Sequence, residues 1–93
     1  MPFKYDFGGD LEENFGGLHK KDRKLYEALM KKIEQIAASY EFTIDHYKNL
    51  SHGMSDYKRV HVGKSFVLIF RVFKKERFIL FDRFRHHDDA YKR

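Results

Sequence analysis

Hydrophobic residues recur along this chain with two different periods, and the change from one period to the other separates strands from helices. Near the start, Phe3, Tyr5 and Phe7 alternate with Lys4 and Asp6. A two-residue period is typical of a strand with one buried face, and the two glycines that follow interrupt it. The sequence therefore predicts a first strand that ends at Phe7.

Two helices are predicted after this strand. Leu11, Phe15 and Leu18 fall on one helical face, and Asp10 and Glu13 have the spacing of a capping box. The glycines at 16 and 17 are expected to end or bend this short helix. A longer helix is predicted over residues 22–39, because apolar side chains recur there every three or four positions, at Leu25, Leu29, Ile33 and Ile36. We interpret this apolar stripe as a core face.

The second half of the chain predicts three successive strands. Residues 39–56 alternate poorly and are expected to form mostly a connecting segment, with a short turn or strand at most. Strands are then predicted over 57–62, 65–73 and 77–84, joined by turns at Gly63-Lys64 and at residues 74–76. The polar tail RHHDDAYKR, residues 85–93, is expected to form a short terminal helix or an ordered arm.

These elements predict an α+β fold. An N-terminal strand and two helices pack on a mainly antiparallel sheet, which a C-terminal meander of three strands completes. One face of the sheet is then partly open. The apolar runs FVLIF at 66–70 and FILF at 78–81 are nearly continuous, so their strands are expected to be central and covered on both sides along part of their length.

Length and composition narrow the class of protein. The chain has 93 residues and no cysteine, so we expect one domain over 1–93 with no disulfide or thiolate metal site. No apolar run approaches the roughly 20 residues that span a bilayer. The start also lacks the pattern of a secretory signal. We expect a cytoplasmic protein.

Charge is distributed unevenly between the two halves. The net charge is +5, and it arises from about −2 in residues 1–45 and about +7 in residues 46–93. Five of the six histidines also lie in the basic half. This segregation suggests a polyanionic partner.

The basic half carries side chains suited to cleaving RNA. The 2′-hydroxyl of RNA can attack the neighbouring phosphorus if one group removes its proton, another protonates the leaving 5′-oxygen, and cations stabilise the phosphoryl charge. Histidine performs both proton transfers near neutral pH, arginine binds phosphate, exposed aromatic rings stack bases, and no metal or other cofactor is required. The candidate residues are Lys48, His52, Arg59, His61, Arg83, Arg85, His86, His87 and Tyr91.

Other readings of these residues stay open. Histidines on a strand are often only exposed residues, and basic side chains mostly form solvated surfaces. The run from His86 to Asp89 has the composition of a metal site. Adjacent residues rarely converge on one ion, however, so metal binding is the weaker interpretation.

Two segments, YKRVHVGKSFVLIFRV from Tyr57 and FDRFRHHDDAYKR from Phe81, resemble the C-terminal half of the RelE/ParE toxin superfamily, and most closely its YafQ-like branch. In that branch a tyrosine and a basic residue precede a histidine-valine strand. An apolar strand, an arginine and a histidine shortly before a terminal aromatic follow. The resemblance covers nearly the whole chain, but its specific motifs lie in the last 37 residues or so.

The resemblance implies the toxin of a toxin–antitoxin module that cuts translated mRNA on the ribosome without a metal. His61 and His87 would then be the acid/base pair, Arg83 a phosphate contact and Tyr91 the terminal aromatic that places the RNA. Two departures from the YafQ-like pattern matter. Ser65 and Phe66 stand where that branch has an acidic residue and a tryptophan, which leaves Phe66 as the aromatic substitute. Lys48, or His52 after a small shift, stands for an early loop histidine.

The resemblance also implies partners: an acidic, partly disordered antitoxin, and the ribosome with its mRNA. Two other functions on the same fold remain open. One is ParE-like inhibition of DNA gyrase, a branch that usually lacks this set of histidines and terminal aromatic. The other is RNA binding without catalysis.

Overall fold

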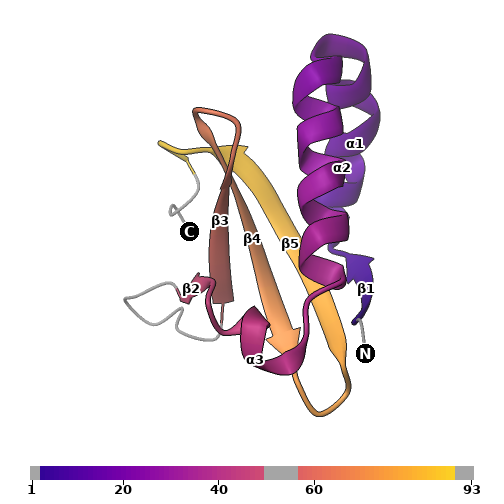
Figure 1. Ribbon diagram of the computed structural model, residues 1–93. Helices are drawn as coiled ribbons and strands as arrows, with labels where there is room; N and C mark the ends of the chain where they lie inside the picture. Colours follow the sequence, from indigo (N-terminus) through magenta and orange to yellow (C-terminus); the bar gives the residue numbers. More distant parts are fainter. Residues whose placement is uncertain (1–2, 50–56, 90–93) are drawn as a thin grey trace.

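A five-stranded mixed sheet forms the framework of the fold in the computed structural model, which describes residues 3–49 and 57–89 (Figure 1). Its strand order is β1-β5-β4-β3-β2. β1 (Lys4–Phe7) runs parallel to β5 (Phe78–His86). The other neighbouring strands pair antiparallel: β5 with β4 (Phe66–Phe73), β4 with β3 (Tyr57–Val62), and β3 with β2 (Lys48–Asn49). The predicted α+β arrangement, with its C-terminal meander, is confirmed.

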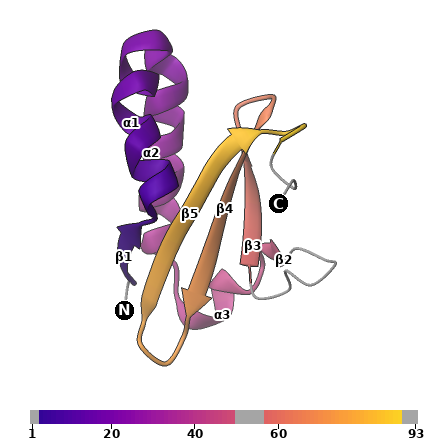
Figure 2. The same ribbon diagram turned by 180° about the vertical axis from the view of Figure 1, so that it is seen from behind.

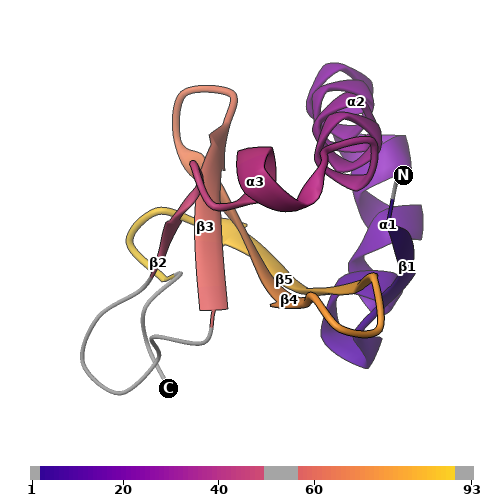
Figure 3. The same cartoon turned by 60° about the horizontal axis from the view of Figure 1, so that its bottom comes forward.

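In the described part of the chain, three helices precede the meander. α1 (Gly9–Lys21) and α2 (Arg23–Ala37) form an antiparallel pair, in which α1 packs against β5 and α2 reaches β3. Asp22 lies between them and caps α2, because its carboxylate accepts a hydrogen bond from the backbone N–H of Leu25. The short α3 (Glu41–Ile44) follows α2 (Figure 3). The view from behind shows β3, β4 and β5 with no helix over them (Figure 2).

The helix α1 differs from its prediction at both ends. It continues through Gly16 and Gly17 to Lys21, although each glycine costs about 1 kcal/mol relative to alanine. Packing of the face that carries Leu11, Phe15 and Leu18 against the core outweighs this cost. The predicted capping box at Asp10 is also wrong, since the cap residue is Gly8, two residues earlier, and it makes no side-chain hydrogen bond.

The main core lies between the helices and the sheet. Leu29, Ile33 and Ile36 of α2 are fully buried, as the predicted apolar stripe requires. They belong to one cluster with inward-facing strand residues that include Leu68, Phe70, Ile79 and Phe81. Val67 and Ile69 form a second buried cluster with Tyr57 on the opposite face of β4. β4 is thus covered on both sides along part of its length, as predicted for both apolar runs. In β5 the face opposite Ile79 and Phe81 is only half-buried, at Leu80.

The segment before β3 contains α3 and the two-residue strand β2, so the short strand allowed by the sequence is present. β5 extends two residues beyond its predicted end at residue 84, which places Arg85 and His86 in the sheet rather than in a tail. No helix in the described ranges is long and apolar enough to cross a membrane. His52 and Tyr91 lie outside the described residues.

Candidate functional site

An irregularity in β5 decides which side chains reach the open face of the sheet. The register between β4 and β5 shifts by one residue, so that Ile69 pairs with Arg83 and Phe70 pairs with Phe81. Asp82 is the extra residue of this β-bulge. Because side chains alternate between faces, the shift keeps Phe84 in the core and turns Arg83 and Arg85 toward the open face.

Cross-strand partners arrange the cationic residues of this face in two rows. One row runs across the sheet through Lys48, Arg59, Ile69 and Arg83, and the next contains His61, Val67 and Arg85. Paired residues of neighbouring strands lie on the same face. The sheet therefore brings together five of the residues predicted from sequence, with the buried Val67 and Ile69 between them.

The two histidines predicted as an acid/base pair lie beside each other. The rings of His61 and His87 are stacked, with centroids 6.0 Å apart and an interplanar angle of 22°. His61 is near the end of β3, and the backbone N–H of His87 donates to the carbonyl of Ser65 at 2.7 Å. Both side chains are exposed. The end of β5 is thus held against the β3–β4 turn, which puts the two imidazoles next to each other.

A carboxylate that the sequence interpretation did not use lies near this pair. Asp88 Oδ1 is 3.8 Å from Nδ1 of His87, and Asp88 Oδ2 is 3.6 Å from Nδ1 of His86. Ser65 stands where the YafQ-like pattern has an acidic residue. Asp88 provides a carboxylate near this position, because it follows His87, whose backbone N–H is bonded to the carbonyl of Ser65. In the sequence, the one indication of a role for Asp88 is its position in the run HHDD, which has the composition of a metal site.

The cations of the open face differ in their partners. Arg83 Nε lies 3.2 Å from a carboxylate oxygen of Asp82, and Arg85 donates to the carboxylate of Asp10 at the start of α1. No carboxylate of residues 3–40, 43–49 and 57–89 lies within ion-pair distance of Lys48 or Arg59. These two cations oppose each other directly across β2 and β3. Like charges in that position repel, so the pair favours an anionic ligand.

Lys58, the neighbour of Arg59, points to the other face and is 9% exposed. Its ammonium donates to the carbonyl of Tyr47 at 3.2 Å and to Oδ1 of Asn49 at 2.8 Å, and it lies 3.9 Å from the carboxylate of Asp45. Burial lowers the pKa of Lys58, and the nearby Asp45 carboxylate opposes that shift. This lysine holds β2 and the preceding segment against β3.

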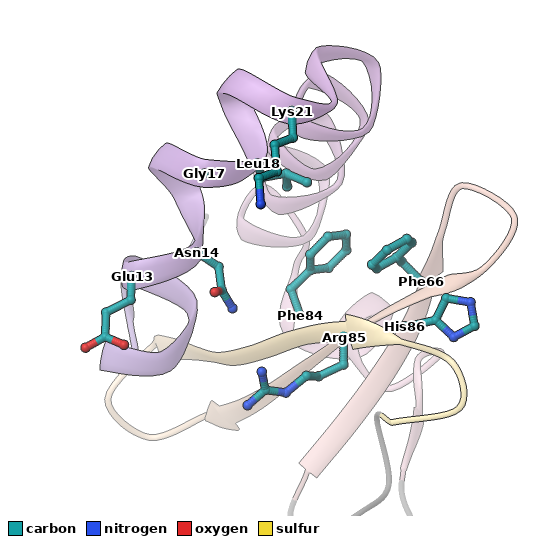
Figure 4. A pocket seen from close by; sticks show the side chains of 9 residues that line it. All are labelled: Glu13, Asn14, Gly17, Leu18, Lys21, Phe66, Phe84, Arg85 and His86. Carbon is teal, nitrogen blue, oxygen red and sulfur yellow. The ribbon is translucent and has the colours of Figure 1, made fainter.

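Two predicted RNA contacts lie on the helix side of the sheet. Phe66 stacks on Phe84 at 5.1 Å, and the ring of His86 meets Phe66 edge-on at 5.5 Å. They line a pocket of about 340 Å³ between α1 and the ends of β4 and β5 (Figure 4). The structure therefore does not bring Phe66 and His86 onto the face that carries His61.

The arrangement suits acid/base chemistry on a bound phosphate. No group of three or more histidine, aspartate or glutamate side chains is gathered for a metal within the described ranges.

Comparisons with known proteins establish the family and the fold of this chain. No protein-family model matches the chain. Over 83 residues, which are 89% of this chain and 84% of the relative, the sequence is 45% identical to the protein named "Putative toxin RelE4" of Methanocaldococcus jannaschii. The chain belongs to the RelE/ParE family of toxins.

Solved structures show the same fold for this RelE-family toxin. The Mycobacterium tuberculosis toxin–antitoxin complex RelBE2 contains a chain that matches with a TM-score of 0.72 and 14% identity, covering 92% of both chains. The E. coli DinJ–YafQ toxin–antitoxin complex matches with a TM-score of 0.65 and 16% identity over 98% of this chain and 99% of the other. Identities this low show the fold alone. The predicted YafQ-like branch is therefore not distinguished from other branches of the family.

Proposed function

We propose that this RelE-family toxin is an endoribonuclease that cleaves ribosome-bound mRNA by metal-independent acid/base catalysis. The observation that carries the proposal is the stack of His61 on His87 beside the cations Lys48, Arg59 and Arg83. Two imidazoles with centroids 6.0 Å apart are within reach of two oxygens of one phosphate group, since each hydrogen bond spans about 3 Å.

The proposed reaction transfers two protons and exchanges one bond. The 2′-oxygen attacks phosphorus while one imidazole takes the hydroxyl proton, and the bond from phosphorus to the 5′-oxygen breaks as the other imidazole supplies a proton. The products are a 2′,3′-cyclic phosphate and a free 5′-hydroxyl. Arg59 and Arg83 would stabilise the charge on the non-bridging oxygens. The carboxylate of Asp88 would orient His87, and Tyr91 would stack on the RNA, as in the sequence-based prediction.

The test is cleavage of mRNA during cell-free translation. The wild-type toxin should create new 5′-ends within translated regions, and His61→Ala or His87→Ala should reduce the rate about 10²- to 10⁴-fold. Lys75→Ala, in the exposed β4–β5 turn, is the matched control and should cleave normally. Intact mRNA at toxin concentrations that stop translation would contradict the proposal. A supercoiling assay with DNA gyrase then tests the ParE-like alternative, and binding without cleavage supports the non-catalytic one.

We also propose an acidic antitoxin as the partner of this toxin. The two similar structures described above are toxin–antitoxin complexes, and the cations Lys48 and Arg59 attract a negatively charged, partly disordered chain. Coexpression with the product of the neighbouring reading frame should yield a complex that does not cleave mRNA. A neighbouring product that neither binds nor neutralises the toxin would count against this partner.

A further inference from the structure

A second groove lies beside the proposed catalytic pair, between α2 and the free edge of β3. β2 pairs with β3 at Lys58 and Arg59, and no other strand of residues 3–49 and 57–89 pairs with this edge of β3 beyond Arg59. The space there has a volume of about 260 Å³. Its polar lining consists of Lys31, Lys32 and Gln35 from α2 and the imidazole of His61.

No carboxylate lines this groove. Glu27, one helical turn before Lys31, pairs instead with Arg23 at 3.5 Å. Among residues 3–40, 43–49 and 57–89, no carboxylate lies within ion-pair distance of Lys31 or Lys32. The groove therefore concentrates positive charge that none of these carboxylates neutralises, which favours an anion in that position.

The pocket on the other side of the same sheet end provides a comparison. Its lining includes the carboxylate of Glu13 together with the cations Lys21 and Arg85 (Figure 4). Two neighbouring pockets thus differ in chemistry. Only the one lined by α2 and His61 combines two lysines with no acid.

We propose that this groove is a phosphate subsite for RNA, and that it holds a backbone phosphate adjacent to the one that is cleaved. The inference rests on the proposed function, because His61 is the shared element: its ring lines the groove and also stacks on His87. A phosphate in the groove would therefore be next to the reacting phosphate along the same strand. Two flexible ammonium groups and an amide suit a phosphate, since lysine binds phosphate as a point charge without fixed geometry.

The first experiment measures binding apart from cleavage. A fluorescent single-stranded RNA with 2′-O-methyl groups cannot be cleaved by 2′-hydroxyl attack, so its affinity reports contacts alone. Replacing both groove lysines, Lys31→Gln with Lys32→Gln, should weaken binding about tenfold and reduce the slope of log affinity against log salt by about 1. The matched control removes the same charge from the far end of the sheet, with Lys4→Gln and Lys75→Gln, and should bind RNA nearly as tightly as the wild type.

Two further measurements locate the contact and guard against misfolding. Inorganic phosphate added to the wild-type toxin should shift the backbone amide NMR signals of Lys31, Lys32, Val62 and Gly63 before those of β1. Replacing both lysines with arginine keeps the charge and should retain RNA affinity within about threefold. A purely structural role of the lysine side chains would not predict this, because arginine differs from lysine in shape.

The possible outcomes separate this inference from the proposed function. Weaker RNA binding in the glutamine variant supports the subsite even if His87→Ala leaves every activity intact, which would overturn only the catalytic proposal. Unchanged RNA affinity in the glutamine variant overturns the subsite. The subsite is also overturned if the glutamine variant keeps its RNA affinity but no longer binds the acidic partner, because the groove would then hold carboxylates of a protein. Absence of any phosphate-induced shift at the groove also overturns it.

Discussion

Lys58 and Arg59 are neighbours on β3 and carry the same charge, but the chain treats them in opposite ways. Lys58 points inward, where two hydrogen bonds and the carboxylate of Asp45 surround its ammonium. Arg59 points outward into a row with Lys48 and Arg83. The first cation has its partners within the fold, and the second has other cations as its neighbours.

This difference suggests how structural and functional charges can be separated in so basic a protein. A cation that the chain pairs with its own polar groups contributes to folding, and removing it leaves those groups unsatisfied. A cation that faces other cations costs stability, so its presence is better explained by a ligand that brings negative charge. The same distinction applies to Lys74, which pairs with Asp45, and to Lys31 and Lys32, which line the groove beside His61.

The largest predicted effect comes from breaking the inner set of contacts. Lys58→Ala should lower the free energy of unfolding by about 2–3 kcal/mol, because the Tyr47 carbonyl and the Asn49 amide lose a charged donor. Arg59→Ala should change it by under about 0.5 kcal/mol. Urea denaturation of both variants measures the difference.

Lys58→Met serves as the control for this prediction, since it keeps the length of the side chain and removes only the ammonium. Its loss should be smaller than that of Lys58→Ala if packing of the aliphatic stem contributes. Equal destabilisation by Lys58→Ala and Arg59→Ala would mean that the two cations do not differ in their structural role.

A smaller effect is expected from removing the carboxylate that serves both structural lysines. The hydrogen bond from Lys74 holds the pKa of Asp45 below its ordinary value, against the opposing effect of desolvation, and the charges of Lys74, Lys58 and His46 add to the lowering. A lowered pKa in the folded state means that this contribution to stability is present above a pH of about 4 and is lost as the pH falls through the folded pKa. Asp45→Asn should remove that acid-dependent part and leave the hydrogen bonds of Lys58 intact.

Unfolding free energies measured from pH 2 to pH 6 test this prediction. The wild type should lose more stability below pH 4 than Asp45→Asn does. Asp6→Asn is the matched control, because Asp6 has no cation within ion-pair distance among the described residues. Parallel pH profiles for the wild type and Asp45→Asn would show that the Asp45 carboxylate adds nothing to stability.

Much of this arrangement could be predicted from the sequence, because it depends on strand direction. β3 and β5 both run antiparallel to β4, so their C-terminal ends lie at the same end of the sheet. His61 lies near one end and His87 follows the other, which is why a simple meander was enough to bring them together. The alternation in YKRVHV likewise placed Tyr57, Arg59 and His61 on one face and Lys58 on the other, as the structure has them.

What the sequence could not reveal depends on long-range packing. The bulge at Asp82 changes the face of every later residue in β5, and only the uneven spacing of Ile79, Phe81 and Phe84 suggested it. The pairing of Arg85 with Asp10 joins residues 75 positions apart. The placement of Phe66 on the helix side depended on the pairing of β4 with β5, and the groove lined by Lys31 depended on how α2 packs beside β3.

The smallest predicted effect is a gain in stability on the outer side of β3. Lys48→Thr should raise the free energy of unfolding by about 0.2–0.5 kcal/mol at low salt, because it removes a like-charge pair with Arg59. Salt screens exposed charges, so the part of this gain that comes from charge should disappear in 1 M NaCl, where the Debye length is about 3 Å. Any gain that persists there reflects the strand preference of threonine.

Lys48→Thr made in an Arg59→Thr background is the control for the strand preference of threonine. The repulsion between Lys48 and Arg59 is already absent there, so salt should hardly change the effect of Lys48→Thr on the free energy of unfolding. RNA affinity should move in the opposite direction, falling in Lys48→Thr as a phosphate contact is lost. A variant that loses both stability and RNA affinity would mean that Lys48 has a partner within the fold, and would place it with Lys58 rather than with Arg59.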